Sequence, residues 1–83
     1  MTVKMIKATI KEADRIFAKG FGHLFRGTDH VYAPNDIVQL IVMDKGKSVE
    51  HISDGKYYRV TAVMNSINAP LEKGWQMIEV KGV

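Results

Sequence analysis

The 83-residue chain contains no cysteine, only two prolines, one tryptophan and no long apolar run. Without cysteine it can form neither a disulfide nor a thiolate metal site. That composition fits a reducing compartment, so we predict a cytoplasmic protein. The longest apolar run, residues 40–43, falls far short of the roughly 20 residues of a membrane-spanning helix. The N-terminus lacks the apolar stretch of a secretory signal. The sequence therefore predicts no membrane partner.

Internal repeats, low-complexity tracts and linker-like segments are also missing, so residues 1–83 are predicted to form a single domain with a small core. The three histidines, His23, His30 and His51, show no metal-ligand spacing, and no acidic cluster stands with them. We therefore predict neither a metal ion nor another cofactor.

Charge is distributed unevenly along the chain. The net charge is +3, but residues 1–26 hold six basic and two acidic side chains, so this third alone carries +4. A one-sided positive field attracts polyanions such as nucleic acids. The alternative is a helix face that is simply kept soluble by its charges.

Local patterns predict a strand, a helix and then further strands. Residues 3–8 alternate as a strand does, and Thr9 with Glu12 matches a helix-capping box. Gly20 suits the left-handed residue that ends a helix. The helix between them has one predicted apolar face, formed by Ile10, Ala13, Ile16 and Phe17, and one basic stripe, formed by Lys11, Arg15 and Lys19.

The second half of the chain reads as short strands. They are predicted over residues 23–26, 36–44, 48–52, 57–65 and 75–80, with a hairpin turn at Asp54-Gly55. Residues 58, 60, 62 and 64 are expected on one face of their strand. Phe17, Tyr58 and Trp75 are expected in the core, whereas Phe21 and Tyr32 lie in turn-like segments and are expected to be exposed.

The segment K-G-F-G-H-L-F-R-G-T-D-H-V-Y-A-P-N-D-I-V-Q-L, residues 19–40, resembles the ASCH (activating signal cointegrator homology) family of the PUA-like superfold. Three residues match motif positions of that family. Gly20 matches its helix-ending glycine, Arg26 its strand arginine, and Asp36 the Asp of the Gly-Asp pair that opens its next strand. The resemblance implies an α+β fold: a small PUA-like β-barrel of about five or six strands, with one helix after the first strand. It also implies a role in RNA processing or transcription coactivation.

Some members of that family hydrolyse acetylated cytidine with a constellation of Lys, Thr and Glu. Here Phe21 and Leu24 stand near the family's lysine and its Thr or Glu. Apolar side chains can neither transfer a proton nor attack a carbonyl. We therefore predict no catalytic residues and little or no turnover. Thr28, Glu79, Lys7 and Lys19 are the groups that a residual activity would recruit.

The sequence thus predicts a domain that binds RNA or a nucleotide in a cleft between the helix and the barrel. The predicted binding residues carry charge, hydrogen-bonding groups or a stacking ring, and they are Arg26, His23, Lys19, Arg15, Lys11, Lys7, Tyr32 and Thr28. For Arg26 the alternative is a structural ion pair with Asp29 or Asp36. A small amidohydrolase of modified nucleosides and a protein-interaction module that uses an edge strand remain as alternative functions.

Overall fold

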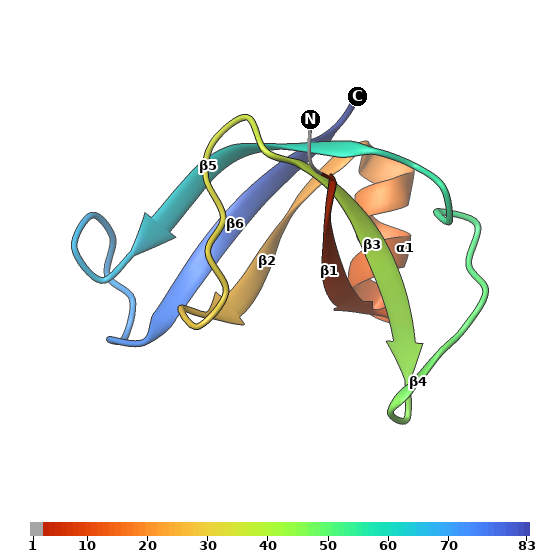
Figure 1. Cartoon of the computed structure of the whole chain (residues 1–83), viewed down its shortest axis with the longest axis horizontal. Helices are drawn as coiled ribbons and strands as arrows, with labels where there is room; N and C mark the ends of the chain where they lie inside the picture. Colours follow the sequence, from red (N-terminus) through yellow and green to blue (C-terminus); the bar gives the residue numbers. More distant parts are fainter. Residues whose placement is uncertain (1–2) are drawn as a thin grey trace.

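The computed structural model describes residues 3–83, which form one helix and six strands. Figure 1 shows them as a sharply bent sheet with the helix behind one half of it. In chain order the elements are β1 (Val3–Thr9), α1 (Ile10–Lys19), β2 (Phe21–Gly27), β3 (Ile37–Asp44), β4 (Lys47–Ser48), β5 (Tyr58–Asn65) and β6 (Trp75–Gly82).

Helix α1 begins and ends where the sequence predicts. The Thr9 hydroxyl accepts from the Glu12 amide, and the Glu12 carboxylate accepts from the Thr9 amide, so the capping box is complete. Gly20 has φ of 78° and donates its N–H to the Ile16 carbonyl, which closes the last turn. A left-handed residue of this kind is inexpensive only for glycine.

The apolar face of α1 is narrower than predicted. Ala13 and Ile16 are buried, but Ile10 is exposed and Phe17 is only half-buried. The placement of Phe17 in the core was therefore wrong. Its ring lies on the flank of the helix, where the Lys56 ammonium sits 5.8 Å from the ring centroid.

The sheet has the strand order β1-β3-β5-β6-β2, with β4 attached to β3. Only β1 and β3 run parallel, and the other pairs are antiparallel. Within residues 3–83 the strands β1 and β2 are the two edges and do not pair, so the sheet is not closed. The predicted small α+β domain with one helix after the first strand is confirmed, but its six strands form an open, bent sheet. The chain leaves β1, forms α1 and returns as β2, and the helix lies directly against β2.

The core lies between the folded halves of the sheet and α1. Its residues come from alternate positions of every long strand and from the helix, and they are Ile6, Ala8, Ala13, Ile16, Leu24, Val38, Leu40, Val42, Tyr58, Val60, Ile78 and Val80. The prediction that Tyr58 is in the core is confirmed.

A β-bulge in β5 overturns the predicted alternation of that strand. Val60 pairs with Val80, but the next paired residue is Ala62, opposite Glu79. The extra residue moves Val63 to the position opposite buried Ile78, where it packs against the core. Ala62 and Met64 therefore lie on the face opposite to the one predicted for them.

Two connections differ from the predicted strands and turns. The strand expected over residues 48–52 is reduced to Lys47–Ser48, because the chain then leaves β3 and crosses toward α1. Asp54-Gly55 does form a turn, with Gly55 at φ of 81°, but it joins no paired strands and is not a hairpin.

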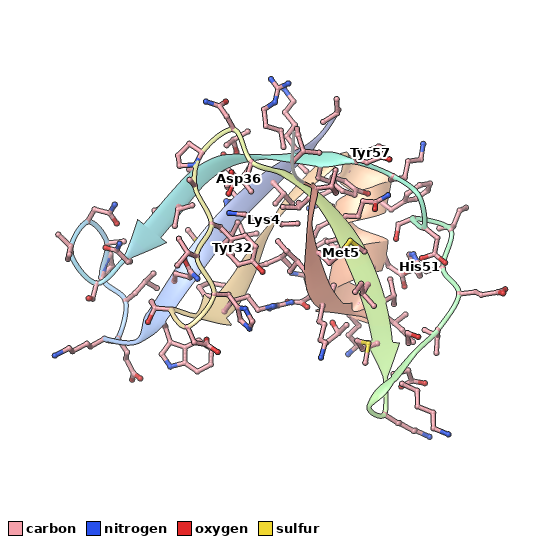
Figure 2. All side chains as sticks on the ribbon, viewed as in Figure 1. Lys4, Met5, Tyr32, Asp36, His51 and Tyr57 are labelled. Atoms are coloured by element: carbon pink, nitrogen blue, oxygen red, sulfur yellow. The ribbon has the colours of Figure 1, made fainter. Side chains whose placement is uncertain are left out.

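The segment of residues 28–36 crosses from β2 to β3 and is tied to three strands. Lys4 on β1 donates to the Val31 carbonyl and to Asp36, and buried Gln76 on β6 donates to the carbonyls of Gly27 and His30. The Asn35 N–H donates to the Val60 carbonyl on β5. Figure 2 shows Lys4, Tyr32 and Asp36 gathered where this segment meets the sheet.

Within residues 3–83, no helix has the length and apolar character needed to cross a lipid bilayer.

Candidate nucleic-acid interface

Arg26 spans the open seam between the edge strands β1 and β2. Its Nε and Nη2 atoms donate to the Lys7 carbonyl. Its two terminal nitrogens also grip the Glu12 carboxylate, with 2.9 Å from Nη2 to Oε1 and 3.3 Å from Nη1 to Oε2. An ion pair was the structural alternative for Arg26, but the observed partner is Glu12 rather than Asp29 or Asp36.

The Glu12 carboxylate accepts hydrogen bonds both from the Thr9 amide in the helix cap and from the Arg26 guanidinium. Burial alone would raise the pKa of its carboxyl, but hydrogen bonds from Arg26 and from the Thr9 amide outweigh burial, and the pKa is lowered. Glu12 is therefore ionised at neutral pH. Its charge offsets that of Arg26, and this pair adds little to the positive field of α1.

A hollow of about 310 Å³ lies beside the seam, lined in part by Lys7, Arg26, His30 and Tyr32. We call it the seam hollow. Tyr32 packs against the core, and burial raises the pKa of its phenol. The Lys4 ammonium lies 5.9 Å from the centroid of the Tyr32 ring. Tyr32 is thus half-buried rather than exposed as predicted, because its ring covers the end of the core.

The second hollow, of about 430 Å³, lies between α1 and β2 and brings together three of the predicted binding residues. We call it the α1–β2 groove. Arg15 and Lys19 line it from the helix, together with Glu12, which is paired with Arg26. Phe21, His23 and Phe25 line it from the strand. Side chains at i and i+4 share a helix face, which explains why the two cations meet here. Phe21 is 50% exposed, as predicted, and Phe25 is 51% exposed.

Backbone donors add to the groove. The Gly82 N–H donates to the Gly20 carbonyl, and the Thr28 N–H donates to the Gly74 carbonyl. These bonds fix the even-numbered residues of β2 as those that bond to β6. The N–H groups of Phe21, His23 and Phe25 therefore point toward the outer edge of β2. The groove combines cations, rings and main-chain donors.

His23 is held in place at the groove by a short chain of hydrogen bonds. Its Nε2 lies 3.0 Å from Glu79 Oε2, and Glu79 Oε1 accepts from the Thr61 hydroxyl at 2.7 Å. The hydroxyl of Thr61 and then the His23 ring hold the pKa of Glu79 below its usual range. The Glu79 carboxylate is therefore engaged with its neighbours, and the imidazole is oriented by it.

The other predicted binding residues lie apart from the groove. Lys11 and Thr28 are exposed and are not among the residues lining either hollow. Lys7 and Tyr32 line the seam hollow with Arg26. The structure thus divides the predicted set in three: one group lines the groove, one lines the seam hollow, and two residues line neither. Arg15, Lys19 and His23 share the groove.

Two aromatic residues on the outer face of the sheet escaped the sequence reasoning. Phe25 was not among the predicted binding residues, and Trp75 was predicted to be in the core. Trp75 is 50% exposed, because it precedes buried Gln76 and therefore faces outward at the start of β6. The alternation Q-M-I-E-V in residues 76–80 was the signal that places Trp75 outside, since Ile78 and Val80 share the inward face with Gln76.

Asp14, His51 and Ser53 form a triple whose order resembles a catalytic triad. His51 Nε2 lies 2.6 Å from Asp14 Oδ1, and its Nδ1 lies 2.8 Å from the Ser53 hydroxyl. The Ser53 amide also donates to Nδ1, and Ser53 is only 1% exposed. A buried hydroxyl cannot meet a substrate. The triple instead fastens the segment after β4 to α1, where Figure 2 places His51.

Each histidine faces a different carboxylate: His23 faces Glu79, His30 faces Asp29, and His51 faces Asp14. In the part of the chain that the structure describes, no group of three His, Cys, Asp or Glu side chains is arranged to hold a metal ion.

No model of a known protein family matches the chain, and a search of curated proteins finds no relative. Neither comparison therefore assigns the chain to a family or indicates a function.

Proposed function

We propose that this domain binds RNA or a nucleotide in the α1–β2 groove. The observation that carries the proposal is the meeting of Arg15 and Lys19 with the rings of Phe21 and Phe25 around one hollow. Cations that track a phosphate backbone, set beside rings on which bases stack, are the two components of single-strand binding surfaces. The outward N–H groups of β2 supply hydrogen-bond donors, and the His23 ring, whose Nε2 is bonded to Glu79, presents its other nitrogen.

The resemblance to the ASCH family also suggests a biological role for the domain. One helix inserted after the first strand of a bent, mostly antiparallel sheet supports a PUA-like fold of the ASCH type. We propose that a domain of this type acts in RNA processing or transcription coactivation, in the cytoplasm. In this proposal Arg26 positions the helix against the seam, and the groove holds the ligand.

Strand addition to the free edge of β2 is the competing use of the same surface. It would employ the outward N–H and C=O groups of β2 and give a protein or peptide partner. The groove next to that edge is lined by Arg15 and Lys19, which an added strand does not need and a phosphate backbone does. The charges therefore favour the polyanion.

The test is fluorescence anisotropy with a labelled oligouridine. Two phosphate contacts predict a slope of about −1.4 in log affinity against log salt, or about sevenfold weaker binding between about 50 and 200 mM salt. The double variant Arg15→Glu/Lys19→Glu should lose most of the binding. No binding at low salt would defeat the proposal.

The matched control is Lys45→Glu/Lys47→Glu, which changes the net charge equally at the exposed turn between β3 and β4. This control should bind nearly as the parent chain does. Equal weakening in both double variants would show that net charge, and not the groove, attracts the oligonucleotide.

A further inference from the structure

The outer face of β2 and β6 continues the α1–β2 groove beyond the residues that line it. Paired residues of an antiparallel ladder carry their side chains on the same face. Phe21 pairs with Lys81, Phe25 with Met77, and Gly27 with Trp75. The rings of Phe21, Phe25 and Trp75 therefore share one face, and each is about half exposed. Gly27, the partner of Trp75, carries no side chain, and the Asp29 carboxylate lies where one would begin.

A separate hollow of about 310 Å³ joins Phe25 to Trp75, with Pro70 and Leu71 as further walls. Phe25 lines both this hollow and the α1–β2 groove. The two depressions therefore meet at the Phe25 ring, and a ligand that fills the groove can extend to Trp75 without leaving the surface.

The length of the row suits an extended run of several nucleotides better than a single nucleotide. Phe21 and Phe25 are four residues apart on one strand, which is about 13 Å at strand rise. Trp75 lies two positions further along and one strand over, so its backbone is roughly 8 Å from that of Phe25. The row of rings is thus about 20 Å long. Bases in a duplex already stack on one another and cannot reach such a row.

Charge gives the row a direction. At the Phe21 end, Phe21 pairs with Lys81 on β6, and Lys81 pairs with Arg59 on β5. Lys19 on the helix lines the groove together with Phe21. At the Trp75 end the hollow is lined by Glu72 and apolar side chains. Phosphates are therefore favoured at the Phe21 end, and bases at the Trp75 end.

We propose that the ligand of the groove is a single-stranded stretch of at least three nucleotides whose bases stack on Phe25 and Trp75. This inference rests on the proposed function and specifies its substrate class. A protein partner would also cover exposed rings, but it gives no reason for the cluster of Lys19, Arg59 and Lys81 at one end of them. The charges select the nucleic acid.

Trp75 is the sole tryptophan of the chain, so its intrinsic fluorescence reports on stacking at this position. Oligouridines of one, three and six nucleotides should be titrated while fluorescence and anisotropy are followed. We expect quenching and tight binding with three and six nucleotides and little of either with one. A duplex of the same length should bind at least tenfold more weakly, about 1.4 kcal/mol by the usual conversion.

Trp75→Ala should weaken binding of the six-nucleotide oligouridine about 5- to 150-fold, the range that loss of one stacked base covers. Trp75→Phe should restore most of the affinity, since a phenyl ring still stacks. The matched control is Tyr57→Ala, which removes an equally exposed ring that precedes β5. Thermal melts of all variants keep a folding defect separate from a binding defect.

The outcomes separate the two proposals. Salt-dependent binding without Trp75 quenching, and unchanged in Trp75→Ala, would overturn this inference and leave the groove as the binding site. Equal affinity for duplex and single strand would overturn it too. Absence of any oligonucleotide binding would overturn both proposals, and self-association abolished by Trp75→Ala would then identify the ring row as a protein-docking face.

Discussion

Arg26 links β1, α1 and β2, which share no ladder of main-chain hydrogen bonds with one another. Its guanidinium donates to the Lys7 carbonyl on β1, to the Glu12 carboxylate on α1 and to the Phe25 carbonyl on its own strand. The planar fork of arginine fits such a set of acceptors, and the single ammonium of lysine does not. Arg26 therefore replaces the hydrogen bonds that β1 and β2 would exchange in a closed sheet.

Arg26→Lys should lower the free energy of unfolding by about 1–3 kcal/mol, because the partly buried Glu12 carboxylate and two carbonyls lose charged donors. Affinity for oligouridine should stay within about twofold of the parent chain if the groove is the ligand site. Urea denaturation and anisotropy on the same variant give both numbers. Arg59→Lys, at an exposed position on β5, is the stability control. Weakened binding with unchanged stability would place Arg26 in the ligand site instead.

Asp36 anchors the segment of residues 28–36. The Lys4 ammonium at 2.8 Å and the Ala33 N–H at 2.8 Å hold the pKa of this carboxyl below its ordinary value. A lowered folded-state pKa gives stability that is fully present above the unfolded value, about 3.9, and is lost as pH falls through the folded pKa.

Asp36→Asn should therefore destabilise the domain by about 1 kcal/mol at neutral pH, a modest value because the pair is partly exposed to solvent. The difference from the parent chain should shrink only below about pH 4. Urea denaturation at a series of pH values measures it. A difference that persists unchanged at pH 2 would show that the lost charge is not the cause.

At the scale of elements, α1 and β2 are fitted together at Gly22. A methyl group added there would lie 2.5 Å from Ile16 Cγ1, which is far inside van der Waals contact. Ile16 is fully buried, and its branch point lies close to the helix backbone, so it cannot move aside freely. Only glycine at this position lets the helix lie directly on the strand, and this close fit forms the floor of the α1–β2 groove.

Gly22→Ala should lower the free energy of unfolding by about 1–3 kcal/mol, because the added methyl group overpacks the contact with Ile16. Combined with Ile16→Ala, which removes the Cγ1 atom at the point of contact, it should cost less than the two single changes together. Gly27→Ala is the control on the same strand, since its new methyl group meets only the mobile carboxylate of Asp29. Thermal denaturation of the four variants checks this. Strict additivity would mean that Gly22 and Ile16 do not contact each other.

The same elements show what the sequence can predict. The capping box at Thr9, the left-handed Gly20 and the strand–helix–strand order depend on neighbours in the chain, and all three predictions are confirmed. The bulge after Val60 and the shortened strand β4 have no such local signal. They arise where the sheet bends and where the segment after β4 is fastened to α1 by His51.

The candidate site could also be predicted only in part, where the contacts depend on neighbours in the chain. Arg15 and Lys19 meet because helical spacing is local. Trp75, by contrast, was misplaced although the alternation of residues 76–80 puts it on the face opposite to Ile78 and Val80. The partner of His23 is 56 positions away, and that of Arg26 lies on the helix rather than in the following turn. Long-range pairing of this kind leaves no periodic trace in one sequence.

In the whole molecule, some basic side chains of residues 1–26 are held in ion pairs, whereas others line the groove where a ligand can reach them. Lys4 is paired with Asp36 and Arg26 with Glu12, whereas Arg15 and Lys19 line the α1–β2 groove. Lys81 and Arg59, which come from much later in the chain, lie beside Phe21 in the register of the sheet. The fold thereby gathers cations from both ends of the sequence around exposed rings.

The most direct test of this account is to map where an oligonucleotide touches the protein. Amide chemical shifts should be followed by NMR while a six-nucleotide oligouridine is added. The largest changes should fall on residues 15–25 of α1 and β2 and on Trp75 and Met77, with little change at the turn of residues 45–47. Largest changes at Lys7, His30 and Tyr32, or at that turn, would contradict the account.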